Sequence, residues 1–185
     1  MTTDSRGDMV RSAAALLARQ GMTATSFSEV VAHSGAPRGS IYHHFPGGKE
    51  QLTREAVELA GGYVLSRQGA CGATTAAGVI ECFVDLWRQV VVGSKGASGC
   101  AVAGVAIDAG EDEAELLALT RSTFRAWTDL LATQLAAAGL PAGRASSVST
   151  ITLASMEGAL ILCRAEGDVA PLEAVADELG RLVAG

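Results

Sequence analysis

The sequence of 185 residues contains few aromatic residues and few charges. Aromatic residues make up 4% of it, too little for a broad aromatic cage around large planar molecules. Charged residues make up 18% and hydrophobic ones 49%, so the chain can bury a sizeable core and is not disordered. No apolar run approaches the roughly 18 residues that span a bilayer, and the N-terminus has no apolar signal region. We therefore expect a cytoplasmic protein with no membrane partner.

Cysteine and histidine are scarce and poorly placed for metal or catalytic chemistry. The four cysteines share no short spacing, and without a signal region they are expected to be reduced thiols. All three histidines fall between residues 33 and 44, which leaves none for a serine–histidine–acid site elsewhere. We therefore expect no enzyme activity, no cofactor and no metal.

The net charge of −6 is unevenly distributed along the chain. Residues 1–54 carry six basic and four acidic residues, whereas the remainder carries eight basic and sixteen acidic ones. The sequence is thus a mildly basic N-terminal segment followed by an acidic body. Such a distribution is compatible with nucleic-acid binding by the first segment alone.

Apolar residues recur at three- and four-residue spacing, and no stretch alternates convincingly between apolar and polar, so the predicted fold is all-α. A first helix is expected over about residues 4–19. A second is expected from Phe27, after the capping-box pair Ser26 and Glu29, and a third from Pro37 to Phe45. Further helices are expected at about 48–67, 74–92, 98–109, 113–138, 142–165 and 171–183.

The stretch SGAPRGSIYHHFPGGKEQL, residues 34–52, holds most of the polar motifs. A metal site fits poorly, because the adjacent His43 and His44 point about 100° apart on a helix and no cysteine or acid completes a ligand set. A phosphate-binding loop of the form G-x-x-x-x-G-K-[ST] also fails. His43 stands where its first glycine should be, and Glu50 follows Lys49.

A short helix that enters the major groove of DNA fits this stretch better. Ile41 and Phe45 form an apolar stripe, and Gly39 and His43 lie on the opposite face. With the capped helix before it and a short turn at residues 33–36, the segment predicts a helix-turn-helix. A surface helix whose polar face meets only water is the alternative.

The residues TSFSEVVAHSGAPRGSIYHHFPGGKEQL, 25–52, resemble the DNA-binding signature of the TetR family of bacterial regulators, in particular its LmrA/YxaF-type branch. The close match covers about residues 8–58, and the segments GCAVAGVAID and MEGALIL resemble the same branch more weakly. The resemblance implies an all-α homodimer with an N-terminal three-helix helix-turn-helix DNA-binding domain, residues 1–47. Residues 48–185 would form a C-terminal helical ligand-binding and dimerisation domain.

The resemblance also implies DNA contacts for individual residues. Thr25 and Ser26 would contact phosphate at the start of the second helix, and Lys49 would do so at the start of the fourth. The recognition helix would present Arg38, Gly39, Ser40, Tyr42 and His43. Many family members have two residues between the final phenylalanine and the lysine, whereas Phe45 and Lys49 enclose three.

The implied function is a ligand-responsive transcriptional repressor. It would bind a palindromic double-stranded DNA operator as a dimer and be released by a small-molecule inducer. A thiol- or redox-responsive DNA-binding regulator is the alternative, because the chain has four cysteines.

The acidic body offers candidates for ligand binding and for dimerisation. Small and apolar residues on the penultimate expected helix suit close helix pairing across a two-fold axis, although they also suit an ordinary core: Ser149, Leu153, Gly158, Leu160 and Ile161. Two aromatic pairs, each on one helical face, could line a ligand cavity or simply fill the core: Phe83 with Trp87, and Phe124 with Trp127. Cys100 and Glu157 are further ligand candidates on apolar helices, with structural burial as the alternative.

Overall fold

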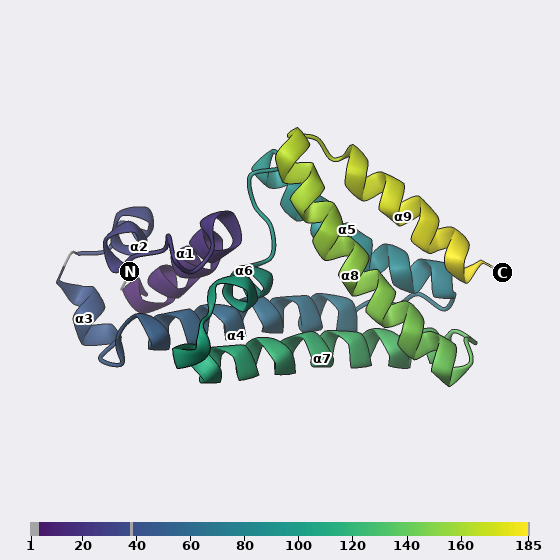
Figure 1. The fold of residues 1–185 in the computed structure, drawn as a ribbon, viewed down its shortest axis with the longest axis horizontal. Helices are drawn as coiled ribbons and strands as arrows, with labels where there is room; N and C mark the ends of the chain where they lie inside the picture. The colour runs from purple at the N-terminus through teal and green to yellow at the C-terminus, as the bar shows by residue number, and fades with distance from the viewer. Residues whose placement is uncertain (1–3, 38, 185) are drawn as a thin grey trace. The chain divides into compact units, whose positions relative to one another are not determined.

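The computed structural model describes residues 4–37 and 39–184, and their regular structure is entirely helical (Figure 1). This confirms the predicted all-α fold. The N-terminal helices are α1 Ser5–Gln20, α2 Phe27–Ser34, α3 Ser40–His44 and α4 Gly48–Gly69. The later ones are α5 Ala76–Ser94, α6 Ala101–Asp108, the 3₁₀ turn η1 Glu111–Glu113, α7 Ala114–Ala137, α8 Ala142–Glu166 and α9 Ala170–Val183.

The third helix starts later than predicted, at Ser40 rather than at Pro37. Both the backbone N–H and the hydroxyl of Ser40 donate to the Pro37 carbonyl, at 3.0 and 2.7 Å. These bonds close a turn ahead of the helix, because a serine side chain competes with the helical pattern for backbone groups. The recognition segment is therefore a five-residue helix with a turn in front of it.

The chain divides into two compact units. Unit 1 contains Met1–Gly62 and Cys100–Thr123, and unit 2 contains Tyr63–Gly99 and Phe124–Gly185. In unit 1, α1 packs against α2, α3 and α6. Its core includes Met9 and Leu17 of α1 together with the predicted stripe of Ile41 and Phe45, all of them buried. The functional boundary predicted between residues 47 and 48 stays a prediction, while the packing of unit 1 continues to residue 62.

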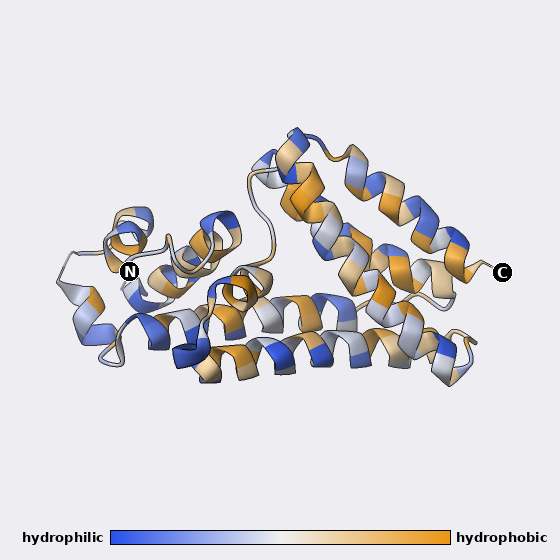
Figure 2. Ribbon diagram, viewed as in Figure 1, coloured by the Kyte–Doolittle hydropathy of each residue, from blue (hydrophilic) through white to orange (hydrophobic). Residues whose placement is uncertain are grey.

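Unit 2 packs α5, α8 and α9 against one another. Its centre holds Phe83, Trp87 and Trp127, each at most 4% exposed. Figure 2 shows apolar residues recurring between polar ones along the helices, which is the pattern of amphipathic helices with one buried face. The helix α8 is long and apolar enough to cross a membrane by length and composition, but 44% of its most apolar window is buried here. Core helices of soluble proteins have the same features.

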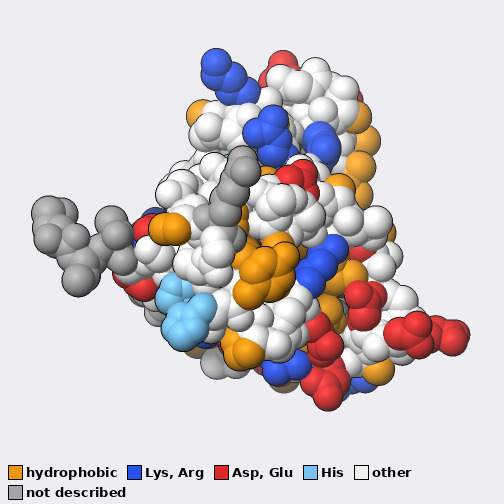
Figure 3. Space-filling view, turned by 90° about the vertical axis from the view of Figure 1, so that its left-hand side faces the viewer, with side chains coloured by type: hydrophobic (Ala, Val, Ile, Leu, Met, Phe, Trp, Pro, Cys, Tyr) orange, Lys and Arg blue, Asp and Glu red, His pale blue; other side chains and the backbone are white. Residues whose placement is uncertain are grey.

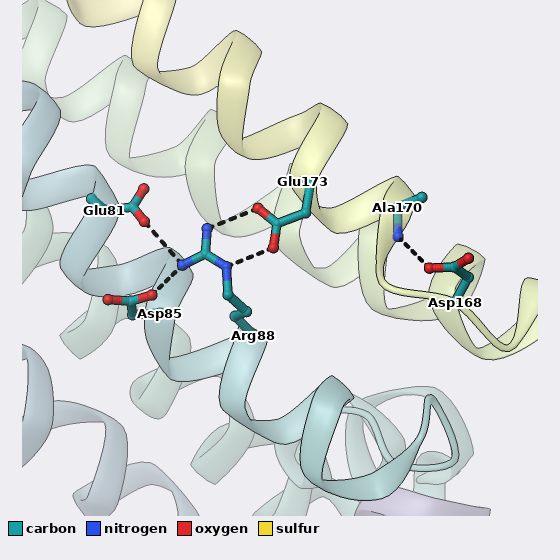
Figure 4. Close-up of polar contacts among 6 residues, drawn as sticks. All are labelled: Glu81, Asp85, Arg88, Asp168, Ala170 and Glu173. Atoms are coloured by element: carbon teal, nitrogen blue, oxygen red, sulfur yellow. Dashed lines mark hydrogen bonds and ion pairs between the residues drawn. The ribbon is translucent and has the colours of Figure 1, made fainter.

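An ion-pair cluster joins α5 to α9 in unit 2 (Figure 4). The guanidinium of Arg88 donates Nε and Nη2 to the two carboxylate oxygens of Glu173, at 2.6 and 2.9 Å. Its Nη1 donates to Glu81 and to Asp85 on the same helix. The hydrogen bonds that Arg88 donates to Glu173 raise the pKa of Arg88 and lower the pKa of Glu173. A forked pair of this geometry fixes α9 against α5.

The expectation of four reduced thiols is wrong for one pair. Cys71, in the loop after α4, and Cys82, in α5, form a disulfide with a Cα–Cα distance of 6.1 Å. Sequence spacing could not show this contact, because it depends on how α5 folds back on the end of α4. Cys100 and Cys163 are buried and form no disulfide in the described part of the chain. Burial raises the pKa of the Cys163 thiol, so the reactive thiolate form is disfavoured there.

Candidate nucleic-acid interface

The start of α2 is fixed by a capping box. The Ser26 hydroxyl accepts from the Glu29 N–H at 3.3 Å, and the Glu29 carboxylate accepts from the Ser26 N–H at 2.9 Å. Gln20 also donates to Glu29, at 3.1 Å. The hydrogen bonds from Ser26 and then Gln20 lower the pKa of Glu29. The predicted cap is thus confirmed, and it holds the first turn of α2 against the end of α1.

A glycine makes the turn between α2 and α3 possible. Gly35 has a φ of 69°, in the left-handed region that other residues rarely occupy, and its N–H donates to the Val31 carbonyl at 3.1 Å. The Ser34 hydroxyl accepts from the Ala36 N–H at 3.3 Å. Together these contacts turn the chain sharply after α2, as a helix-turn-helix requires.

The short helix α3 presents one buried and one exposed face. Ile41 is 1% exposed, whereas Tyr42 is 70% exposed and His43 is exposed beside it. The Tyr42 ring meets Phe27 of α2 edge-on, with 5.5 Å between ring centroids. Ser40 is half-buried and Gly39 exposed. Figure 3 shows histidine side chains grouped on the molecular surface. The face can therefore offer hydroxyl and imidazole groups to a nucleic acid.

The structure places the other predicted DNA contacts in three different ways. Arg38 lies outside the described residues, and its role stays a prediction. Lys49 is exposed in the first turn of α4, and its charge contributes to the lowered pKa of Glu29 in α2. Thr25 is only 5% exposed, and its hydroxyl donates to the Gly21 carbonyl at 2.7 Å. That hydroxyl would have to change partner to donate to a phosphate.

A glycine pair links α3 to α4. Gly48 has a φ of 71° and donates its N–H to the Phe45 carbonyl at 3.0 Å. The Gly47 N–H donates to the Gln51 side chain at 2.9 Å. Side-chain and main-chain hydrogen bonds thus close the turn. The turn accommodates the three residues between Phe45 and Lys49, where many family members have two.

The predicted ligand-binding aromatics come together in unit 2. Trp87 meets Phe83 and Trp127 edge-on at centroid distances of 6.1 and 6.0 Å, and Phe124 meets Trp127 at 5.5 Å. The space beside Phe83 and Trp127 measures about 130 Å³ and is too narrow to hold water. In this conformation the aromatics are therefore core. Glu157 is half-buried on α8, and Cys100 belongs to unit 1, where its sulfur accepts from the Ala103 N–H at the start of α6.

Sequence reasoning missed a polar contact in the same region. Gln68 at the end of α4 is 1% exposed and donates to the Val79 carbonyl at 3.3 Å and to the Gln134 side chain at 2.8 Å. Gln134 returns a bond to the Gln68 carbonyl at 2.8 Å. No local sequence pattern predicts this contact, because 66 residues separate the two side-chain amides.

The predicted dimer residues on α8 divide between two faces. Ser149, Leu153 and Leu160 are buried within unit 2, whereas Gly158 and Ile161 are exposed. Ile161 is 64% exposed, and Ile151 and Leu162 on the same helix are also exposed. Residues 4–37 and 39–184 contain no group of three or more His, Cys, Asp or Glu side chains that could hold a metal ion.

Comparisons with known proteins place these features in a family. Residues 10–56 match the bacterial regulatory proteins of the tetR family, and residues 76–178 match the C-terminal domain of LmrA/YxaF-like transcriptional regulators. An uncharacterised HTH-type transcriptional regulator of Mycobacterium tuberculosis is 37% identical over 183 residues, which cover 96% of this chain and 93% of the relative. The HTH-type regulator LmrA of Bacillus subtilis is 29% identical and covers 91% of each chain.

Solved structures agree with the sequence relatives. A TetR transcriptional regulator from Legionella pneumophila matches with a TM-score of 0.87 at 22% identity, over 99% of this chain and 100% of that one. A TetR regulator from Chloroflexus aurantiacus matches with a TM-score of 0.78 at 26% identity, over 96% and 93% of the two chains. Fold, helix-turn-helix and sequence relationship all point the same way, and the chain belongs to the TetR family of bacterial transcriptional regulators, with an LmrA/YxaF-like C-terminal domain.

Proposed function

We propose that this protein is a cytoplasmic repressor that binds a palindromic DNA operator as a homodimer and is released by a small-molecule inducer. The observation that carries the proposal is the helix-turn-helix of unit 1. Its α2 is capped by Ser26, its turn is made by Gly35, and its α3 exposes Tyr42 and His43 over a buried Ile41. Such a helix can lie in the major groove while capped helix starts contact phosphates.

DNA binding is tested by selecting an operator from random duplexes and measuring its dissociation constant at several salt concentrations. We expect affinity to fall with salt, because phosphate contacts release counterions. Arg38→Ala should cost about 1–3 kcal/mol of binding if Arg38 contacts a base. Arg181→Ala, which removes the same charge from an exposed residue of α9, is the control. A protein that selects no duplex would refute the proposal.

The dimer proposal is supported by the exposed apolar face of α8. Ile151, Ile161 and Leu162 are 46%, 64% and 51% exposed, and a Cβ added at Gly158 would meet nothing within 4 Å. A second copy could cover this face across a two-fold axis. Ile161→Glu should give monomers in sedimentation velocity. Ile107→Glu, at a site 75% exposed on α6, should leave the dimer intact.

The inducer site is proposed beside the aromatic cluster of unit 2. The indole N–H of Trp87 is buried and has no hydrogen-bond partner among the described residues, so a ligand acceptor would satisfy it. A ligand would have to open the packed side chains there, and only a ligand that prefers the opened conformation could release DNA. Trp87→Phe should bind DNA as tightly as the wild type. Inducers that release the wild-type protein from DNA should release this variant less effectively. Equal release by both proteins would remove Trp87 from the site.

A redox-responsive regulator remains a second candidate because of the Cys71–Cys82 disulfide. Both residues are half-buried, unlike the fully buried Cys163. Hydrogen peroxide could oxidise the two thiols to the disulfide with release of two waters, and a dithiol could reduce it again. DNA affinity that changes several-fold on reduction of the wild type, but not of Cys71→Ser, would support this candidate. Identical affinities of the oxidised and reduced wild type would remove it.

A further inference from the structure

Helix α6 lies unusually close to the end of α1, and both belong to unit 1. A Cβ added at Gly104 would lie 2.7 Å from the Leu17 carbonyl oxygen and 3.4 Å from the Gly21 Cα. Real Cβ atoms do not approach backbone that closely, so this packing requires glycine at residue 104. The contact brings the last turn of α6 to the loop between α1 and α2.

The last residue of α6 binds that loop directly. The Asp108 carboxylate accepts a hydrogen bond from the Thr23 N–H at 2.9 Å. Gly21, with a φ of 76°, leaves room for the carboxylate, because a Cβ there would lie 2.5 Å from the same oxygen. The loop N–H therefore has an acceptor that lies 85 residues further along the chain.

The position of Asp108 is unfavourable for α6 itself. A negative charge at the C-terminus of a helix opposes the helix dipole, where a basic residue would be stabilising. The carboxylate thus contributes to the contact with the loop and not to the stability of its own helix. This argues that the Asp108–Thr23 bond serves the loop.

The loop in turn leads to the start of α2. Beyond Thr23, the Ala24 carbonyl accepts from the Gln20 side chain at 2.7 Å, and Ser26 begins the capping box. Each residue from 23 to 26 therefore has a contact that fixes its backbone or side chain. Among these contacts, only the one with Asp108 comes from α6, and Asp108 is also the partner furthest away in sequence.

We propose that Asp108 is a positioning residue for DNA binding. It holds the Gly21–Thr25 loop so that the capped start of α2 faces the phosphate backbone in register with α3. The inference rests on the proposed function, since it assigns a role in DNA binding. It predicts an effect of unusual sign: removing an acid from a DNA-binding protein ordinarily strengthens binding by lowering repulsion, whereas removing Asp108 weakens it.

The test compares Asp108→Ala with Asp112→Ala, a charge-matched control in exposed η1. Asp108→Ala should weaken DNA binding about tenfold, the effect of losing one charge-assisted hydrogen bond. Asp112→Ala should bind as tightly as the wild type or tighter. Asp108→Asn should bind within about twofold of the wild type, because its amide oxygen can still accept the Thr23 N–H.

A second readout needs no DNA. Hydrogen exchange at the Thr23 amide should accelerate in Asp108→Ala and stay slow in Asp108→Asn, at unchanged melting temperature. If Asp108→Ala does not fold, Gly104→Ala, which forces α6 away from Leu17, provides the same comparison.

Three outcomes are decisive. Equal DNA affinity for Asp108→Ala and Asp112→Ala overturns the inference, as does an Asp108→Asn protein that is as defective as the alanine variant. A wild type that binds no DNA instead defeats the proposed function, and the exchange arm still decides whether Asp108 fixes the loop.

Discussion

Each of the two compact units is stabilised internally by a different kind of contact. Unit 1 combines short helices with caps and single hydrogen bonds near the surface, such as Ser26 with Glu29 and Thr23 with Asp108. Unit 2 combines longer helices with an aromatic core, a disulfide and the forked Arg88–Glu173 pair. Surface hydrogen bonds orient backbone but add little stability, whereas burial of large aromatics adds much.

This difference suits a division of labour. A DNA-reading segment needs its helix starts and turns in defined orientations, and caps and turn glycines supply them locally. A body with the proposed ligand site and dimer face would need a stable packed frame. If the comparison is correct, substitutions in unit 2 should change global stability. Substitutions in unit 1 should act locally and on DNA binding.

The largest effect is expected at the centre of unit 2. Trp127→Ala should lower the free energy of unfolding by about 3–5 kcal/mol, because the indole is 2% exposed and its removal leaves a cavity. Urea unfolding followed by circular dichroism measures this. Phe124→Ala, at a half-buried ring of the same cluster, should cost clearly less. A loss below about 1 kcal/mol for Trp127→Ala would contradict a rigid aromatic core.

A smaller and more local effect is expected in unit 1. Ser26→Ala should cost about 1 kcal/mol, because it removes the acceptor for the Glu29 N–H at the start of α2. Hydrogen exchange should accelerate over residues 24–34 and stay unchanged in unit 2. Ser28→Ala, which leaves the capping box intact, is the control. Acceleration spread evenly over both units would show that the cap does not act locally.

The smallest effect concerns Glu173 and depends on pH. The folded-state pKa of Glu173 lies below the ordinary value of 4.5, so its pairing with Arg88 stabilises the fold above that pH. This stability is lost as pH falls through the lowered pKa. The side chain of Glu173 is 43% exposed. The free energy of unfolding of the wild type should therefore exceed that of Glu173→Gln by no more than about 1 kcal/mol at pH 7.

The measurement is thermal unfolding of both proteins from neutral to acidic pH. The difference between them should shrink as pH falls below about 4.5. Glu178→Gln serves as the control, since Glu178 and its partner Arg181 are 70% and 69% exposed. A difference that grows on acidification would contradict the pairing.

Local signals in the sequence predicted the helices well. Periodicity and the Ser26–Glu29 cap placed α2 at Phe27, and the glycine pair placed the start of α4 at Gly48. Pro37 was wrongly assigned to a first helical turn, because the side-chain bond of Ser40 to its carbonyl depends on a rotamer that no pattern shows.

Contacts between residues far apart in the chain could not be predicted from the sequence. The disulfide, the Gln68–Gln134 pair and the Asp108–Thr23 bond all depend on which helices meet in space. Asp108 ends the apolar helix α6, and only the folded structure shows that its carboxylate binds a loop of the DNA-binding segment. The aromatic residues of the body were identified, but only packing shows that they touch one another.

Both tryptophans of the chain, Trp87 and Trp127, lie in unit 2, within the same edge-on cluster. Indole fluorescence therefore reports on unit 2 alone, and unit 1 contributes no signal at wavelengths that excite only indole. Their 6.0 Å separation also lets excitation pass between the rings, so a ligand that displaces either one alters the emission of both. The protein thus contains an intrinsic fluorescent label in unit 2, without any engineered dye.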